Sequence, residues 1–358
     1  MKDIQAMTDA LLALSSKLKG ARSEAIIALS GDASDRQFYR VILQGHEVKS
    51  AILMLVTKNL GPLVSGVKRS QDLSFVEIGT FLKQHDISVV EIYVDATDQG
   101  AILVEDLGDQ AIWQTIHHPE KFLQNGLKDP ATHYFKQSID LLLTLQALPS
   151  DRSCISFLRE LGEHEYRTEA QRFIDYCLMP IGAEQKLISE VWTLISNISK
   201  ELSVLPKVFT HRDFMPWNLH IAGETVKIID FQDALMAAPL YDLIALLHDR
   251  DIDSALGIER VRELISYYRQ RSGVNIEFKR AYNLTLLQRS LRLAGQFRML
   301  SGEKNRLQYQ GWVPGCLFRI GWCLRELGEN ALLAALSQII QEVGQGAKSA
   351  WGSAAMFE

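Results

Sequence analysis

Hydrophobic periodicity changes once along this chain, and that change limits the folds available to it. Up to about Asp106, short apolar runs such as residues 25–29, 38–43 and 50–56 alternate with small polar turns. Runs of this length, bounded by Gly, Ser and Asp, are typical of antiparallel strands joined by hairpins. After Asp106 the apolar residues recur every three to four positions, which indicates amphipathic helices.

We therefore predict an α+β fold with two lobes, the second larger than the first. Residues 1–106 would form a small lobe, mainly an antiparallel sheet with one helix packed on it. Residues 107–358 would form a large, mainly helical lobe. A chain of 358 residues is long enough for each lobe to bury a core. Besides an opening helix that stops at Gly20, helices are expected at 72–84, 133–148, 184–202, 258–272, 278–300 and 316–343.

The composition is that of an ordinary globular protein, with 47% apolar and 23% charged residues. A formal net charge of −5 gives no electrostatic reason to expect a nucleic-acid or anionic-lipid partner. The apolar runs are far shorter than the ~20 residues of a membrane span, and the N-terminus does not read as a signal peptide. The four cysteines form no C-x-x-C pair. We expect reduced thiols in a cytoplasmic protein, without zinc; a monomer is compatible with the sequence, which leaves the oligomeric state open.

Two motifs carry the strongest functional signal: HRDFMPWN at residues 211–218 and IIDFQD at residues 228–233. Phosphoryl transfer from a nucleotide requires a carboxylate that orients and deprotonates the attacking hydroxyl, and oxygen ligands that hold Mg²⁺ on the phosphates. Asp213 fits the first role, and the side chains of Asn218 and Asp230 fit the second. Only a turn separates the motifs, so a hairpin would return Asp230 to the side of Asn218. Chance polar residues would rarely give both motifs in this order.

Together with APLYDL at residues 238–243, these motifs resemble the aminoglycoside phosphotransferase and choline kinase superfamily, whose members are relatives of protein kinases. The resemblance extends from Ser30 to about Leu327. Three stretches are moreover similar to bacterial cell-wall-recycling sugar kinases, which phosphorylate N-acetylmuramate and N-acetylglucosamine at the anomeric hydroxyl. These stretches are GDASDRQFYR at 31–40, LVEDLGD at 103–109 and DFQDA at 230–234.

The resemblance implies a role for each of these positions, with ATP and Mg²⁺ as cofactors. Asp213 would be the catalytic base, and Asn218 and Asp230 would be magnesium ligands. A hairpin tip would cover the ATP phosphates, although its single glycine is also compatible with an ordinary polar turn. An interlobe hinge would hydrogen-bond adenine through its backbone. The tip comprises Ser30, Gly31, Asp32, Ala33 and Ser34, and the hinge comprises Val104, Glu105 and Asp106.

Two further carboxylates follow the motifs. Asp242 is predicted to cap the helix that begins at Leu243 and to brace the HRDFMPWN segment. Asp233 would contact the substrate or a second cation, with a solvated loop carboxylate as the alternative.

One feature departs from the kinase pattern. Kinases of this superfamily place a lysine on the third strand, paired with a helix glutamate, to hold the α- and β-phosphates. Here that position falls on Leu55 or nearby. Lys49 and Lys58 lie close by and Glu77 is a candidate glutamate, but strand alternation makes the pair doubtful. The missing lysine fits the recycling sugar kinases, and equally a nucleotide-binding pseudokinase.

The acceptor substrate is predicted to be a small molecule, with an amino sugar favoured over an aminoglycoside, choline, another amino alcohol or a fructosamine. An aminoglycoside site would need a strongly acidic helical lobe, whereas the part of the chain from 260 to 325 is rich in arginine. That arginine run would either bind an anionic substrate group, such as a lactyl carboxylate, or form a solvated helix face. Its members are Arg289, Arg292, Arg298, Lys304 and Arg306.

Overall fold

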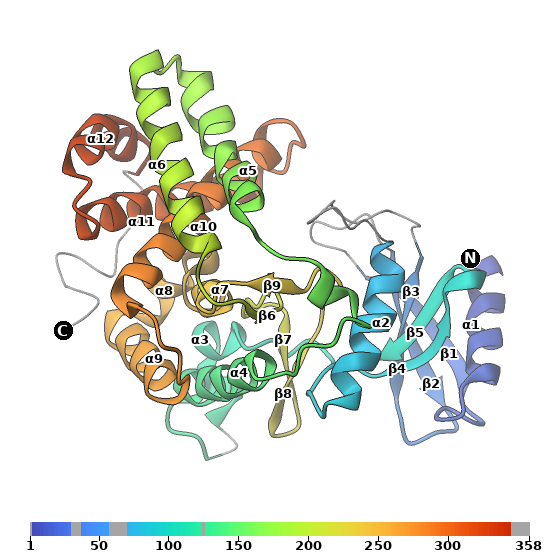
Figure 1. The fold of residues 1–358 in the computed structure, drawn as a ribbon. Helices are drawn as coiled ribbons and strands as arrows, with labels where there is room; N and C mark the ends of the chain where they lie inside the picture. Colours follow the sequence, from blue (N-terminus) through green and yellow to red (C-terminus); the bar gives the residue numbers. More distant parts are fainter. Residues whose placement is uncertain (1, 30–36, 57–69, 124–125, 345–358) are drawn as a thin grey trace.

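The structure is a computed structural model that describes residues 2–29, 37–56, 70–123 and 126–344. Its N-terminal lobe is built on a five-stranded antiparallel sheet with the spatial order β1-β2-β3-β5-β4 (Figure 1). The strands are β1 (Arg22–Leu29), β2 (Phe38–Gln44), β3 (Ser50–Leu55), β4 (Ile92–Ala96) and β5 (Ala101–Glu105), and the lobe's helices are α1 (Lys2–Leu14) and α2 (Gln71–Gln84).

The two helices of this lobe pack on opposite faces of the sheet. Leu53 of β3 points into a small core with Leu11 of α1, whereas its neighbour Met54 points into the main core with Phe75 of α2. Successive side chains of a strand alternate between faces, so β3 contributes to both cores. The sequence predicted one helix packed on the sheet, and α1 is the second.

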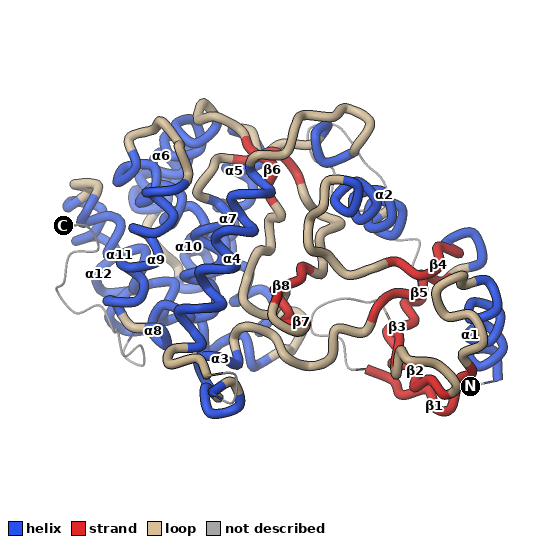
Figure 2. Tube along the Cα trace, turned by 90° about the horizontal axis from the view of Figure 1, so that it is seen from below, coloured by secondary structure: helices blue, strands red, loops and turns tan. Residues whose placement is uncertain are grey.

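The C-terminal lobe is mainly helical, and Figure 2 shows its helices at one end, the N-terminal sheet at the other, and two short strands, β7 and β8, between them. It has two two-stranded sheets, β6 (Val208–Thr210) with β9 (Leu235–Ala237) and β7 (Leu219–Ala222) with β8 (Thr225–Ile228). Its α-helices are α3 (Gln114–His117), α4 (Pro130–Gln146), α5 (Glu163–Phe173), α6 (Gln185–Ser203), α7 (Tyr241–His248), α8 (Ile252–Leu256), α9 (Ile258–Arg271), α10 (Phe278–Gly302), α11 (Val313–Glu326) and α12 (Asn330–Gly344).

The predicted α+β, two-lobed fold is confirmed, with several differences among the helices. The opening helix ends at Leu14 rather than at Gly20, and the short helices α3 and α8 were not predicted. The helix predicted at residues 316–343 is two helices, α11 and α12, because Gly328 between them adopts a φ of 81° that ends a helix. The sequence also missed α5, a strongly polar segment. Only a few of its residues, such as Tyr166 and Phe173, are buried, so it has little apolar periodicity to detect.

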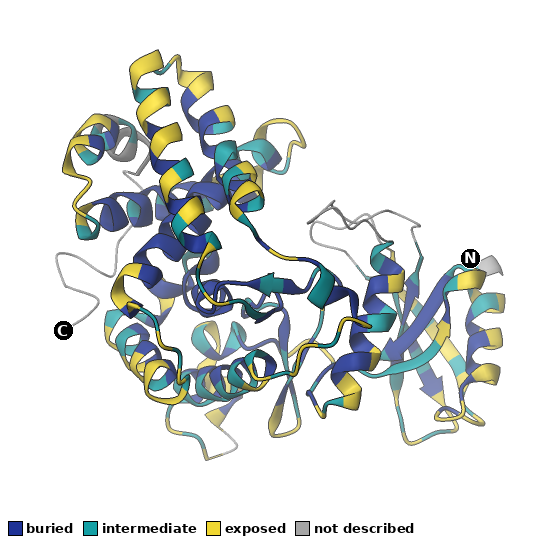
Figure 3. Cartoon of the chain, viewed as in Figure 1, coloured by how far each residue is buried: buried dark blue, intermediate teal, exposed yellow. Residues whose placement is uncertain are grey.

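Helix α10 runs through the middle of the C-terminal lobe. It contacts α5, α6, α7 and α11, and Figure 3 shows it buried for most of its length. A helix that is covered on all sides normally carries apolar residues all round. This one also buries Arg289 and Arg292, and such charges must be paired or face a polar cavity.

Contacts between the lobes gather where the chain leaves β5. Lys227 of β8 donates to both carboxylate oxygens of Glu105 at 2.7 Å, and the backbone N–H of Val90 donates to the carbonyl of Ile228. These contacts fix the sheet above the β7–β8 hairpin. Within the described ranges, no helix is both long and apolar enough to cross a membrane.

Candidate active site

A cavity of about 790 Å³ lies between the N-terminal sheet and the helical lobe. Ile52 and Met54 of β3 line it from the sheet. Asp213 and Asn218 line it from the segment 211–218, called the HRD loop below, and α10 forms a further wall. The cavity therefore brings together Asp213, Asn218 and Asp230, which the sequence singled out for catalysis and magnesium binding.

The HRD loop follows β6, and the carboxylate of Asp242 holds the backbone at its start. One oxygen of this carboxylate accepts the backbone N–H of His211 at 2.6 Å and the other accepts that of Arg212 at 2.9 Å. Arg212 has a φ of 79°, a conformation that costs energy for a residue with a side chain. The predicted brace is therefore present, but the predicted cap is wrong. Helix α7 begins after Leu240 without a side-chain cap, because both oxygens of Asp242 are used by the loop.

His211 and Arg212 tie the loop to its surroundings. Burial lowers the pKa of His211, so the ring is neutral and its Nε2 lies 3.0 Å from the carbonyl oxygen of Ile229, where it donates. Arg212 donates to Glu169 of α5 at 2.7 Å. The loop is thus fixed between the end of β8 and the helical lobe.

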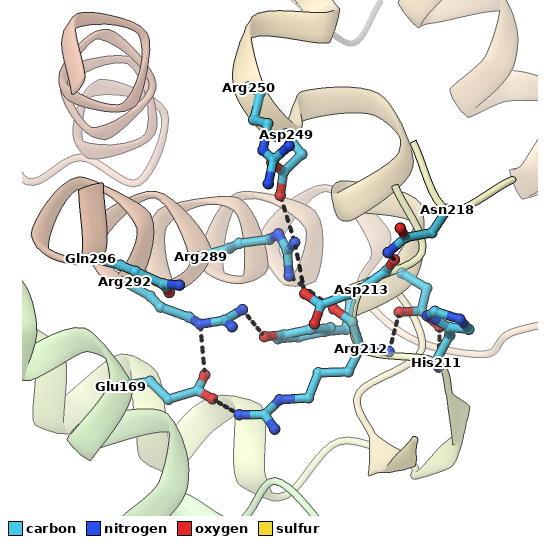
Figure 4. A network of polar contacts seen from close by, with 12 residues as sticks. Glu169, His211, Arg212, Asp213, Asn218, Asp249, Arg250, Arg289, Arg292 and Gln296 are labelled. Atoms are coloured by element: carbon cyan, nitrogen blue, oxygen red, sulfur yellow. Dashed lines mark hydrogen bonds and ion pairs between the residues drawn. The ribbon is translucent and has the colours of Figure 1, made fainter. Parts of the chain in front are cut away.

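Asp213 projects from this loop into the cavity, with 30% of its side chain exposed (Figure 4). Arg289 lies 3.9 Å from its carboxylate. Burial alone would raise the pKa of Asp213, but nearby guanidinium groups, first of all those of Arg292 and Arg289, outweigh it and hold the pKa below its usual value. Asp213 is therefore ionised at neutral pH and can accept a hydrogen bond or a proton.

Asn218 and Asp230 lie beside Asp213 because of the β7–β8 hairpin. The N–H of Ile229 donates to the Asn218 carbonyl at 3.0 Å, which brings Asp230 back to the HRD loop. The side-chain amide of Asn218 donates to the Asp213 carbonyl at 2.9 Å. Asp230 has a φ of 66° and accepts from Gln232 at 2.8 Å. Both Asn218 and Asp230 line the cavity.

Asp233 also lines the cavity, at the boundary between the lobes. It accepts a hydrogen bond from Gln71, the first residue of α2, at 3.2 Å. This contact joins the IIDFQD motif to the N-terminal lobe, so Asp233 is more than a solvated loop carboxylate.

The predicted hinge runs along the cavity, but its carboxylates already have partners. The side chain of Val104 is buried, and Glu105 is paired with Lys227. Asp106 accepts from Arg40 of β2 at 2.7 Å, and Arg40 also binds Asp109 at 2.8 Å. The predicted phosphate-covering tip, Ser30 to Ser34, lies outside the described residues.

The third strand has no lysine that faces the cavity. The sequence placed the kinase lysine position on Leu55 or nearby, and the Leu55 side chain packs toward α1. The residues of β3 that line the cavity are Ile52 and Met54. Glu77 of α2 accepts the backbone N–H of Ile155 at 2.7 Å. Lys58 lies outside the described residues.

A basic wall of the cavity faces the HRD loop. The sequence predicted only part of this wall. Arg289 and Arg292 line the cavity, whereas Arg298 lines a different one on the far side of α10. Arg250 also lines the cavity but was missed, because it stands alone in the sequence after α7. The neighbouring residue, Asp249, accepts a hydrogen bond from Arg289 at 2.6 Å. Lys304 and Arg306 are not among the residues that line the cavity.

The fold and this cavity define a class of enzyme. Residues 25–281 match the model of the phosphotransferase enzyme family, and the chain therefore belongs to that family. It is a small-molecule kinase that uses a nucleotide.

Relatives and solved structures agree with this class. A protein named N-acetylmuramate/N-acetylglucosamine kinase from Pseudomonas putida is 27% identical over 338 residues, which cover 90% of each chain. A protein of the same name from Pseudomonas aeruginosa is 25% identical over 335 residues, again 90% of each.

Among solved structures, a choline kinase from Streptococcus pneumoniae matches with a TM-score of 0.58 and 13% identity, over 91% of this chain and 99% of its own. A spectinomycin phosphotransferase, solved with ADP and spectinomycin, matches with a TM-score of 0.55 and 14% identity, over 94% and 98%. At these identities the similarity is one of fold.

Proposed function

We propose that this protein transfers the γ-phosphate of Mg·ATP to the anomeric hydroxyl of an N-acetylated amino sugar of the N-acetylmuramate or N-acetylglucosamine type. The observation that carries the proposal is the position of Asp213, Asn218 and Asp230 along one wall of a cavity between the two lobes. The proposal for the acceptor draws on the names of the two Pseudomonas relatives.

Asp213 acts as the base in this proposal. The anomeric oxygen attacks the γ-phosphorus, the bond from phosphorus to the bridging oxygen of ADP breaks, and the hydroxyl proton passes to the Asp213 carboxylate. An anomeric hydroxyl is more acidic than an ordinary sugar alcohol. A carboxylate whose pKa the neighbouring arginines hold low is a weak base. It therefore suits this acceptor, for which alignment matters more than base strength.

Asn218 and Asp230 would hold the magnesium ion. The side-chain nitrogen of Asn218 is used by the Asp213 carbonyl, which leaves its oxygen for the cavity. One carboxylate and one amide oxygen, with phosphate and water oxygens, form the kind of ligand set that Mg²⁺ prefers. The described residues contain no cluster of three or more His, Cys, Asp and Glu suited to a metal, so the nucleotide must complete this set. When bound, Mg²⁺ would neutralise charge on the phosphates.

The nucleotide would lie under β3, with the boundary between the lobes at residues 106 and 107 and the backbone of Val104 to Asp106 available to adenine. Arg40 holds Asp106 and Asp109 together at this end. We also propose that the enzyme works in the cytoplasm, where ATP is abundant. Its four cysteines are buried free thiols, which is compatible with a reducing compartment.

Choline fits the cavity less well than a sugar. A quaternary ammonium is best bound by aromatic faces. Trp217, Phe297 and Tyr309 line this end of the cavity. The guanidinium of Arg250 already lies 5.1 Å from the ring centre of Trp217 and 6.0 Å from that of Tyr309. A second cation there would be repelled, and the same holds for a polycationic aminoglycoside.

The test is product identification. The protein is incubated with Mg·ATP and N-acetylmuramate or N-acetylglucosamine, with EDTA in a parallel reaction. We expect a magnesium-dependent sugar 1-phosphate, recognised by its hydrolysis in mild acid, which leaves a 6-phosphate intact. Robust turnover of choline or kanamycin with none of either sugar would contradict the proposed acceptor and leave the kinase class unchanged.

A further inference from the structure

The wall of the cavity that faces the HRD loop is basic. It consists of Arg250, Arg289, Arg292 and the amide side chain of Gln296 (Figure 4). Asp249 is the carboxylate of this wall, and it is buried and bound to Arg289 at 2.6 Å. The acids that line the rest of the cavity belong to the HRD loop, the IIDFQD motif, the hinge and Asp109. The cavity therefore has an acidic side, where Arg40 is paired with Asp106 and Asp109, and a basic side.

Arg289 and Arg292 are the two arginines that α10 contributes to this wall. Arg292 donates to the Tyr241 hydroxyl at 2.9 Å and lies 3.7 Å from Glu169. The Nε atoms of Arg289 and Arg292 are buried and have no hydrogen-bond partner. These atoms are too buried for a ligand in the cavity to reach, and the ion pairs with Asp249 and Glu169 balance the two charges. Arg250 adds a further positive charge to the wall.

Arg250 is held at this wall by an unusual backbone. It has φ 46° and ψ 42°, and the next residue, Asp251, has φ 63°. Such conformations cost energy for residues other than glycine and persist where the surrounding structure enforces them. The Arg250 guanidinium packs 5.1 Å from the ring centre of Trp217 and 5.0 Å from that of Trp312. Its side chain is only 11% exposed.

A buried ionic network enforces that backbone. Arg319 of α11 donates to Asp251 at 3.2 Å and to Asp253 at 3.1 Å. Asp253 also lies 3.0 Å from the His248 ring. Asp251 approaches α11 at Gly315 so closely that a Cβ there would lie 1.8 Å from its carboxylate oxygen. The chain on both sides of Arg250 is therefore fixed, and the side chain is pre-organised.

We propose that Arg250, which lies beyond Arg289 and Asp249 in the basic wall, binds a carboxylate of the acceptor substrate. The enzyme would then prefer N-acetylmuramate, which carries a lactyl carboxylate, over N-acetylglucosamine, which has a hydroxyl in its place. This inference rests on the proposed function. Guanidinium groups match carboxylates in geometry and charge, and a pre-organised cation binds an anion at low entropic cost.

The geometry is compatible with the reacting hydroxyl at Asp213. A chain of contacts runs from Asp213 to Arg289 at 3.9 Å, on to Asp249 at 2.6 Å, and then to Arg250 at 3.7 Å. The lactyl ether is attached two ring carbons from the anomeric carbon. Its carboxylate is therefore separated from the hydroxyl that Asp213 would receive, and in this proposal it would face Arg250.

Isothermal titration calorimetry in the presence of Mg²⁺ and a non-hydrolysable ATP analogue tests this inference. The ligands are N-acetylmuramate, its methyl ester and N-acetylglucosamine. They are titrated into the wild type, Arg250→Gln, Arg250→Lys and Arg298→Gln. Arg298 lines a different cavity, so its variant loses the same charge away from this wall. Turnover of both sugars is measured in parallel.

We expect the wild type to bind N-acetylmuramate about tenfold or more tightly than either ligand without the carboxylate, because a desolvated ion pair contributes at least this much. Arg250→Gln should remove most of that ratio, Arg250→Lys should retain part of it, and Arg298→Gln should keep it. Equal affinity for all three ligands, or an Arg250→Gln ratio like that of the wild type, would overturn the inference. So would the absence of binding by any of them.

Turnover separates this inference from the proposed function. Binding that depends on the carboxylate and on Arg250, without phosphorylation of either sugar, would reject the proposed acceptor and support the basic wall as a carboxylate site. Phosphorylation of both sugars with equal affinity would support the proposed function and reject this inference.

Discussion

The two walls of the cavity are built in opposite ways. The acidic wall comes from one short piece of chain, residues 211–233, in which Asp213, Asn218 and Asp230 are positioned by a loop and a hairpin. The basic wall comes from α10, which carries Arg292, and from the turn after α7, which carries Arg250. These two residues are far apart in the sequence. In the proposed function the first wall would hold Mg²⁺, and the second would bind an anionic group of the acceptor. Transfer of phosphate to an anionic sugar would use both walls.

The largest effect is expected at Asp213, the residue of the acidic wall that lies 3.9 Å from Arg289 of the basic wall. Asp213→Asn removes the proposed base and a negative charge beside Arg289, so kcat should fall by about 10²- to 10⁴-fold. Nucleotide affinity should change little. Steady-state kinetics and calorimetric titration of Mg·ATP measure the two quantities. A variant that kept most of its turnover would show that the HRD loop is not the catalytic element.

The two walls should also separate in binding. Asp230→Ala and Asn218→Ala each remove a proposed magnesium ligand, so we expect about tenfold or more weaker binding of the Mg·nucleotide. Arg250→Gln should instead weaken acceptor binding more than nucleotide binding. Titration of both ligands into each variant gives a two-by-two comparison. If acidic-wall and basic-wall variants weakened the two ligands alike, the division of the cavity by charge would be wrong.

The same contrast explains what the sequence could predict. Asp213, Asn218 and Asp230 lie within 18 residues of each other in two motifs, and local pairing brings them together, so their neighbourhood follows from spacing. Arg250 is held at the cavity by the network of Arg319 with Asp251 and by packing on Trp217 and Trp312. These are long-range contacts that no local pattern encodes. The β3 register shows another limit. Strand alternation indicated two faces, but only the packing of α1 shows that Leu55 belongs to the face away from the cavity.

A smaller effect tests the brace beneath the acidic wall. Burial raises the pKa of Asp242 to about 6, although two backbone N–H groups favour its ionised form. An acid with a raised pKa in the folded state binds its proton more tightly folded than unfolded. It therefore contributes stability below pH 6 that is lost as the pH rises through 6. The free energy of unfolding of the wild type, minus that of Asp242→Asn, should be about 1 kcal/mol larger at pH 5 than at pH 7.

Urea unfolding of both proteins at the two pH values measures this difference. A difference that is equal at pH 5 and pH 7, or larger at pH 7, would mean that Asp242 is ionised throughout and that its two hydrogen bonds outweigh burial.

The smallest effect is expected in the N-terminal lobe, at the residues that the sequence offered for a kinase lysine pair. Glu77→Gln keeps an oxygen that accepts the Ile155 N–H, so kcat/KM should change by less than about threefold. Glu77→Ala leaves that buried N–H without a partner and should lower the free energy of unfolding by about 1–3 kcal/mol. Lys58→Ala should likewise have a modest effect on activity. Loss of activity in Glu77→Gln or Lys58→Ala comparable to that of Asp213→Asn would require a lysine pair on the phosphates. Glu77 would then have to release the Ile155 N–H to form that pair. The nucleotide would be held by a third charged surface in addition to the two walls.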